Sequence, residues 1–154
     1  MMTKLAESPL AETDRPALAA MLREAGLPAD DIGEPGRAFF LYRDESGRIV
    51  GCGGLEGSGS DLLLRSVAIL PERRGEGLGG AIVAWLEARA AAAGCRRLWL
   101  LTTTADGFFA RIGYAPAERT TAPETIAATR QFAGLCPSSA RLMCRVLAAS
   151  NDSA

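Results

Sequence analysis

The chain has 154 residues, which is long enough to bury a substantial core. Its composition, 48% hydrophobic and 23% charged residues with a formal net charge of −1, excludes a disordered chain. No basic surface for nucleic acid is indicated, and no apolar run reaches the roughly 18 residues that cross a membrane. The first residues lack the apolar segment of a signal peptide. We expect one domain over residues 1–148, a disordered tail at 149–154, and a cytoplasmic protein.

Cysteine and histidine usage limits the possible chemistry. The four cysteines (Cys52, Cys95, Cys136 and Cys144) contain no Cys-x-x-Cys pair, so we expect buried, reduced thiols. Histidine is absent, which excludes His-based triads and His-ligated metals. We therefore predict no metal site, and proton transfer falls to carboxylate, tyrosine, cysteine, backbone or water.

The N-terminal part predicts a weak strand at 5–8 and then a helix from a Thr13 cap to about Ala25, with an apolar stripe on one face. Residues 30–36, rich in Asp, Gly and Pro, predict a loop or a single helical turn. Strands are predicted at 39–42, 49–56 and 61–70, joined by polar turns at 44–47 and 57–60. Three such strands in succession form an antiparallel meander.

A glycine-rich turn follows the third strand. Gly75, Gly77, Gly79 and Gly80 leave the backbone free to adopt positive φ and to approach a ligand closely. A helical pattern to about Gly94 begins here, so main-chain N–H groups at its start can bind an anion. Arg73 and Arg74 add positive charge, and we predict a phosphate or diphosphate site.

Other phosphate-binding turns fit less well. A Walker loop would need Gly-Lys-Ser/Thr, and no lysine stands here. The spacing Gly75-x-Gly77-x-x-Gly80 matches a dinucleotide fingerprint, but Pro71 and two arginines separate it from the strand. The expected acid about 20 residues on is replaced by residues 95–97, Cys-Arg-Arg. A plain surface loop and nucleotide-phosphate binding stay open as alternatives.

The phrase Ile69-x-Pro71-x-x-Arg74-Gly75-x-Gly77-x-Gly79 resembles motif A of the GNAT superfamily of acetyl-CoA-dependent acyltransferases, whose core is Arg/Gln-x-x-Gly-x-Gly/Ala. Residues 102–114, with Phe108-Phe109 and Gly113-Tyr114, are similar to its motif B. The resemblance implies an α/β fold, the GNAT fold. Its mixed central sheet has six to seven strands flanked by helices. The strands at 61–70 and 97–101 form a splayed parallel pair.

The resemblance implies acetyl-CoA as cosubstrate, with its diphosphate on the turn and its pantetheine arm paired to the strand before it like an added strand. The implied coenzyme-binding residues are Val67, Ala68, Ile69, Arg74, Gly75, Glu76, Gly77, Leu78, Gly79 and Phe109. Many relatives carry a tyrosine at position 109, which protonates the departing thiolate. Phenylalanine has no such proton, so water or Tyr114 must protonate the thiolate, or the thiolate must leave unaided.

The C-terminal part predicts a helix at 124–132, a loop at 134–140 and a strand at 142–147. The phrase Gln131-Phe132-x-x-Leu135-Cys136-Pro137-x-Ser139-Ala140-x-x-Met143, with Leu64-Arg65-Ser66, resembles the arsenic-resistance N-acetyltransferase branch. This likeness implies a small amino-acid-like amine as acceptor, arsenic-containing or glutamate-like. No nucleic-acid or membrane partner is predicted, and a homodimer is left open.

The implied reaction is direct attack of an amine on the thioester through a tetrahedral oxyanion. A main-chain N–H near Val67 or Ala68 is the expected oxyanion donor. Glu56 is the candidate general base, acting through water; it could equally be a solvated charge at a strand end.

Three polar residues are candidates for binding the acceptor. Arg65 could bind its carboxylate as a bidentate fork, or be an exposed or salt-bridged residue. Ser66 could hydrogen-bond the same substrate or occupy a strand bulge, and Thr103 could contact the amine or the coenzyme, or cap a helix. The alternative function is a non-catalytic acyl-CoA sensor, in which Phe109 marks lost acid catalysis.

Overall fold

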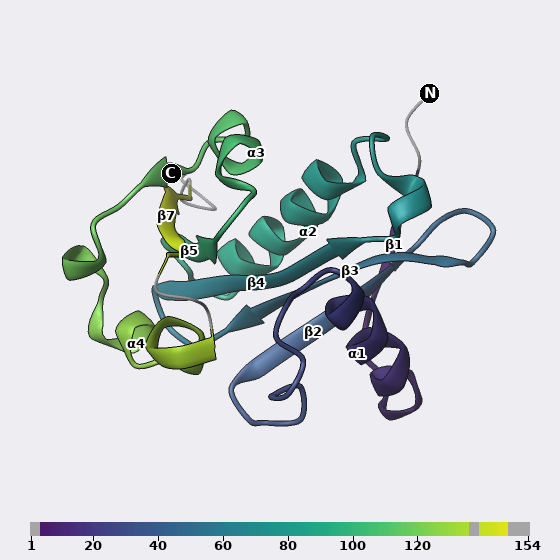
Figure 1. Ribbon diagram of the computed structural model, residues 1–154, viewed down its shortest axis with the longest axis horizontal. Helices are drawn as coiled ribbons and strands as arrows, with labels where there is room; N and C mark the ends of the chain where they lie inside the picture. The colour runs from purple at the N-terminus through teal and green to yellow at the C-terminus, as the bar shows by residue number, and fades with distance from the viewer. Residues whose placement is uncertain (1–3, 136–138, 148–154) are drawn as a thin grey trace. The chain divides into compact units, whose positions relative to one another are not determined.

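In the computed structural model, which describes residues 4–135 and 139–147, the strands form one mixed seven-stranded sheet, as predicted. Their order across the sheet is β1-β2-β3-β4-β5-β7-β6 (Figure 1). The strands are β1 (Ala6–Pro9), β2 (Arg37–Arg43), β3 (Ile49–Glu56), β4 (Asp61–Ile69), β5 (Arg97–Thr102), β6 (Ala115–Pro116) and β7 (Arg141–Val146). β4 and β5 are parallel, and β1 with β2 and β5 with β7 are antiparallel.

Helices connect these strands. The α-helices are α1 (Arg15–Glu24), α2 (Leu78–Ala92), α3 (Asp106–Arg111) and α4 (Glu124–Ala127). Short 3₁₀ turns are η1 (Glu12–Asp14), η2 (Pro71–Arg73) and η3 (Arg119–Thr121), and η4 (Gln131–Leu135) is a π-helical turn. The predicted order of strand, glycine turn, long helix and parallel strand is confirmed.

The described residues form two compact units. The first consists of the chain up to Leu55 together with Ser66–Leu86, and the second consists of Glu56–Arg65 together with the chain from Glu87. The division therefore falls before the last residue of β3, within β4 between Arg65 and Ser66, and within α2. The prediction of a single domain over residues 1–148 stays a prediction.

The core of the first unit joins α1 to the sheet. Leu18 and Leu22 of α1 are completely buried and pack against Phe39, Leu41, Cys52 and Ala68 of β2, β3 and β4. Figure 1 shows α1 running beside β2 and β3. The apolar stripe expected in this helix is therefore the face that the sheet covers, and burial of one such leucine contributes about 1.5–3 kcal/mol.

Glycines in β3 let α2 approach the sheet closely. A methyl group on Gly51 would lie 2.6 Å from Ile82 Cδ1 and 2.9 Å from the Ala68 carbonyl oxygen. A methyl group on Gly53 would lie 2.6 Å from Leu86 Cδ1. Glycine at these two positions thus leaves space for the ends of the Ile82 and Leu86 side chains of α2.

The second unit contains the β4–β5 pairing. Asp61, Leu62 and Leu63 pair with Arg97, Leu98 and Trp99, while β4 continues to Ile69 and β5 to Thr102. The Trp99 indole donates a hydrogen bond to Asp61 Oδ1 at 2.8 Å. The core of this unit contains Leu63, Trp99, Ile126 and Leu142.

Two helix boundaries differ from the expectation. The predicted Thr13 cap is wrong, because η1 takes up Thr13 and α1 begins at Arg15 after Asp14. The helix expected at 124–132 ends at Ala127. The Thr129 hydroxyl donates to the Ile126 carbonyl at 2.7 Å and accepts from the Phe132 N–H, so a local side-chain network replaces the helical ladder. The predictions for Cys136 and for the tail at 149–154 lie outside the described residues.

Candidate functional site: the glycine turn and its neighbours

The turn between β4 and α2 has the backbone conformation that its glycines permit. Gly75 and Gly77 have φ angles of 87° and 80°, and a methyl group on either would meet no atom within 4 Å. Glycine is thus needed here for the left-handed conformation and not for space, since other residues adopt it only with strain. Both positions are exposed to solvent.

The N–H groups of this turn are available to a ligand. Backbone hydrogen bonds engage the N–H groups of Arg73 and Arg74, and the next N–H so engaged is that of Ala81, which donates to the Gly77 carbonyl. Within the described chain, no backbone acceptor takes the N–H groups of Gly75, Gly77, Leu78 or Gly79. They lie at the positive end of the 15-residue helix α2. The arrangement suits an anion with several oxygens.

The two arginines of the turn differ, which the sequence did not indicate. Arg73 pairs with Asp44 at 2.8 Å and reaches both carboxylate oxygens of Glu76, at 2.9 and 3.1 Å. Arg74 is exposed and forms no ion pair in the part of the chain that the structure describes. The cation available to a ligand is therefore Arg74, the residue that occupies the motif position.

β4 carries an irregularity immediately before the turn. Ser66 is buried, yet its φ is 64°, the one positive value among the described non-glycine residues. Its carbonyl accepts a hydrogen bond from the Cys52 thiol, and burial raises the pKa of that thiol to about 12. Beyond Ser66, Ala68 is buried in the core, whereas Val67 and Ile69 are partly exposed. This conformation agrees with the expected strand bulge at Ser66.

Glu56 and Arg65 meet in the second unit. Arg65 Nη1 lies 2.8 Å from Glu56 Oε1, and the side chains are 0% and 8% exposed. Arg65 is therefore buried and ion-paired, and Glu56 is not a solvated charge. Buried charges are stable only when paired in this way.

The motif B segment packs into the interior of the second unit. Phe109 is buried, with its ring edge-on to Tyr114 at a centroid distance of 5.6 Å, whereas Phe108 and Ile112 are partly exposed. The Tyr114 hydroxyl donates to Glu87 Oε2 at 2.9 Å, and Arg145 pairs with the same oxygen. Burial first, and then Glu87, raise the pKa of Tyr114 far above its usual value. Such a hydroxyl is a poor proton donor.

Thr103 is exposed just beyond β5. The hydroxyl that serves the start of α3 belongs to Thr102, which accepts the Ala105 N–H at 3.0 Å. Thr102 thus fills the capping role that was considered for Thr103, and Thr103 is exposed to solvent.

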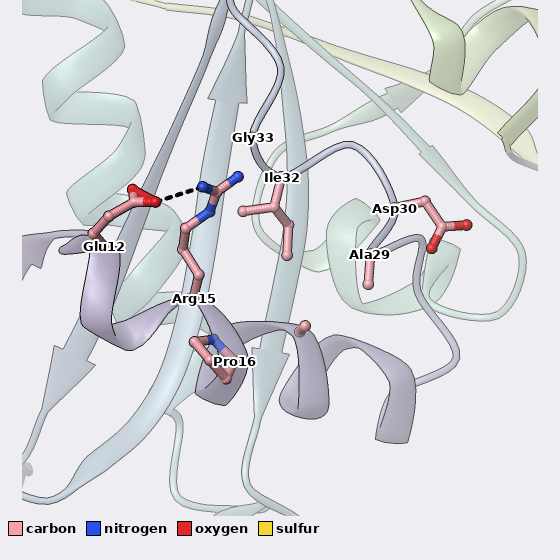
Figure 2. A pocket seen from close by; sticks show the side chains of 8 residues that line it. Glu12, Arg15, Pro16, Ala29, Asp30, Ile32 and Gly33 are labelled. Atoms are coloured by element: carbon pink, nitrogen blue, oxygen red, sulfur yellow. Dashed lines mark hydrogen bonds and ion pairs between the residues drawn. The ribbon is translucent and has the colours of Figure 1, made fainter.

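An open hollow lies over the start of α1 (Figure 2). Glu12 and Arg15 point toward one another on one side and form an ion pair of 2.7 Å, while Asp30 lies across the hollow on the 29–33 loop. A methyl group on Gly33 would lie 1.8 Å from Arg15 Nη2, so the guanidinium rests against the backbone of the loop. The loop predicted at residues 30–36 thus borders this hollow.

In residues 4–135 and 139–147, no three or more carboxylate or thiol side chains gather as metal ligands would. Over the same residues, no helix combines the length and the apolar character that a membrane span requires.

Comparisons with known proteins agree with this geometry. A family model described as an acetyltransferase (GNAT) domain matches residues 35–116. A protein from Chlorobaculum tepidum, named an uncharacterized N-acetyltransferase, is 34% identical over 98 residues, which are 63% of this chain and 62% of that protein. The chain thus spans under two thirds of that relative.

Solved structures share the fold. N-acetylglutamate synthase from Neisseria gonorrhoeae, complexed with coenzyme A and N-acetyl-glutamate, superposes with a TM-score of 0.79 at 21% identity; the match covers 96% of this chain and 36% of that one. Rv2747 from Mycobacterium tuberculosis, in complex with CoA and NLQ, superposes with a TM-score of 0.72 at 24% identity; the match covers 93% of this chain and 99% of that one. At these identities the likeness shows the fold alone.

Proposed function

Because this chain belongs to the GNAT family of acetyltransferases, we propose that it transfers an acetyl group from acetyl-CoA to the amine of a small amino-acid-like substrate. The observation that carries the proposal is the turn at residues 74–79. Among the described residues, no backbone acceptor takes the N–H groups of Gly75, Gly77, Leu78 and Gly79, and Arg74 forms no ion pair; this turn leads into the N-terminus of α2. Diphosphate is an anion that such a turn suits.

The pantetheine arm of the coenzyme would lie along Val67, Ala68 and Ile69. Its diphosphate would accept hydrogen bonds from residues 74–79. The partly exposed side chains of Val67 and Ile69 and the left-handed backbone of Ser66 support this placement. Phe109 would contact the arm or the thioester through its ring. CoA in two of the fold relatives also supports acetyl-CoA as cosubstrate.

In the proposed chemistry, the neutral amine attacks the thioester carbonyl carbon, a C–N bond forms, and the C–S bond breaks. The Val67 N–H would stabilise the oxyanion, and the ammonium proton would pass through water to Glu56. Because a thiol has a pKa of about 8.5, the thiolate can leave near neutral pH without a dedicated acid. Phe109 and the raised pKa of Tyr114 both favour this unaided departure.

For the acceptor we propose Arg65, Ser66 and Thr103 as binding residues. The planar Arg65 guanidinium, with its five N–H donors, matches the geometry of a carboxylate or an arsenic oxyacid, and this chemistry supports the proposal. The finer proposal, an arsenic-containing or glutamate-like amino acid, rests on the branch-like phrase around Arg65 and Gln131. Cys136 and Pro137 of that phrase lie outside the described residues. A cytoplasmic location belongs to the same proposal, supported by the free thiols of Cys52, Cys95 and Cys144.

The test has two stages. Calorimetric titration should show CoA binding and no comparable binding of ATP. A CoA-release assay should then find turnover among amino acids, phosphinic and arsenic analogues, and polyamines. No CoA binding would overturn the proposed function, and ATP binding in its place would favour a nucleotide site.

A second candidate is a non-catalytic acyl-CoA sensor, which the buried Phe109 and the occupied Tyr114 hydroxyl favour. CoA binding without turnover of any amine would support it. Turnover of one amine, blocked by a competing CoA analogue, would exclude it.

A further inference from the structure

A chain of side-chain contacts connects the glycine turn to the hairpin turn between β2 and β3. Arg73 reaches across to Asp44, 29 residues earlier, at 2.8 Å, and on its other side it holds both oxygens of Glu76. The Arg73 and Asp44 side chains are only 19% and 13% exposed. All these residues belong to the same compact unit.

Asp44 is itself fixed. Its Oδ1 accepts hydrogen bonds from the N–H and hydroxyl of Ser46, at 2.9 and 2.7 Å, and from the Arg48 N–H at 3.1 Å. Its second oxygen is left for Arg73. The hydrogen bonds from Ser46 and then Arg73 hold the pKa of Asp44 well below its usual value. The carboxylate therefore stays ionised and in place near neutral pH.

Glu76 stands between the two glycines with positive φ. A Gly-Glu-Gly segment has large backbone freedom, so ordering its N–H groups around an anion is entropically costly. A side chain held at its centre reduces the number of conformations that the free protein samples. Binding is then tighter because less order must be created by the ligand.

We propose that Arg73 and Asp44 are positioning residues for the coenzyme, which hold the N–H groups of residues 75–77 in the conformation that receives the diphosphate. The inference rests on the proposed function, since it concerns the same turn. In this proposal Arg74 contacts the diphosphate, whereas Arg73 does not contact it and holds the turn through Glu76. The 44–48 hairpin turn thereby becomes part of the coenzyme site without touching the coenzyme.

Asp44→Asn provides a test, because two explanations predict opposite changes in the Kd for CoA. If charge alone mattered, removing a carboxylate near an anion site would tighten CoA binding. If Asp44 positions the turn, its removal should raise the Kd for CoA roughly three- to tenfold. The ratio of kcat/KM for acetyl-CoA to that for acetyl-pantetheine, which lacks the diphosphate, should fall by the same factor, with kcat unchanged.

Glu72→Gln is the matched control. It removes one nearby carboxylate and its exposed ion pair with Arg48, and it leaves Asp44 and Glu76 in place. It should not raise the Kd for CoA. Because Asp44 acts through Arg73, Arg73→Gln combined with Asp44→Asn should weaken binding no more than Arg73→Gln alone.

Hydrogen exchange of the free protein separates failure of this inference from failure of the proposed function. Amides 75–77 should exchange faster in Asp44→Asn than in the wild type or Glu72→Gln. Unchanged exchange, or a Kd for CoA that is unchanged or lower, would overturn the positioning role. A wild-type protein that binds no CoA would instead refute the proposed function, and the exchange result would still stand.

Discussion

At the scale of single residues, the buried pair of Arg65 and Glu56 decides what either can do. Each is the other's counter-charge, at 2.8 Å, with at most 8% of either side chain exposed. A substrate carboxylate that binds Arg65 therefore adds to an existing pair. Removing one partner leaves a buried charge without compensation.

We expect Arg65→Met to lower the free energy of unfolding by about 3–5 kcal/mol and to raise the acceptor KM, with little change for acetyl-CoA. Chemical denaturation and steady-state kinetics measure these effects. Glu56→Gln combined with Arg65→Met should recover much of the stability, because no charge is then stranded. Its acceptor KM should stay high. An unchanged acceptor KM in a folded Arg65→Met or Arg65→Lys protein would rule out the anchor role.

Gly77 provides the second prediction at this scale. With φ at 80°, alanine there requires a left-handed conformation that costs about 1–2 kcal/mol. Gly77→Ala should therefore lower the melting temperature and weaken CoA binding, as calorimetry would measure. Gly80→Ala is the control, since Gly80 lies in α2 with no atom within 4 Å of a methyl group. Equal CoA affinities of the two variants would show that the conformation of residue 77 is unimportant.

At the scale of elements, the approach of α2 to β3 sets where the helix N-terminus lies. Gly51 faces Ile82 of the helix and also the Ala68 carbonyl, which is backbone and cannot rotate away. Gly53 faces mainly the flexible end of Leu86. A larger side chain is therefore accommodated less easily at position 51 than at position 53.

Gly51→Ala should lower the free energy of unfolding by about 1–3 kcal/mol through overpacking, and Gly53→Ala by less. Denaturant titration compares the two. Because the Ala68 backbone, which belongs to the proposed pantetheine-binding segment, must shift in Gly51→Ala, the CoA affinity of this variant should also fall. If Gly53→Ala proved the more destabilising, the assignment of the fixed contact to Ala68 would be incorrect.

At the scale of the molecule, β4 belongs to both compact units, and its change of unit coincides with the left-handed Ser66. All the proposed coenzyme residues except Phe109 lie in the first unit. Glu56 and Arg65 lie in the second. β4 therefore carries Arg65 and Ser66, two of the three proposed acceptor residues, directly before Val67, Ala68 and Ile69, which are proposed to bind pantetheine.

The sequence by itself determined the order of elements and the coenzyme turn. Glycine spacing, strand alternation and the helix after the turn are local signals, and positive φ at Gly75 and Gly77 follows from residue type. The early end of α4 was missed because Thr129 forms a network that helix patterning does not reveal. Only the tertiary structure decided which charges are paired. Asp44 is 29 residues from Arg73, and Tyr114 is 27 from Glu87. Contacts between residues so far apart arise from how the sheet and helices pack, because no local pattern encodes which distant side chains will meet.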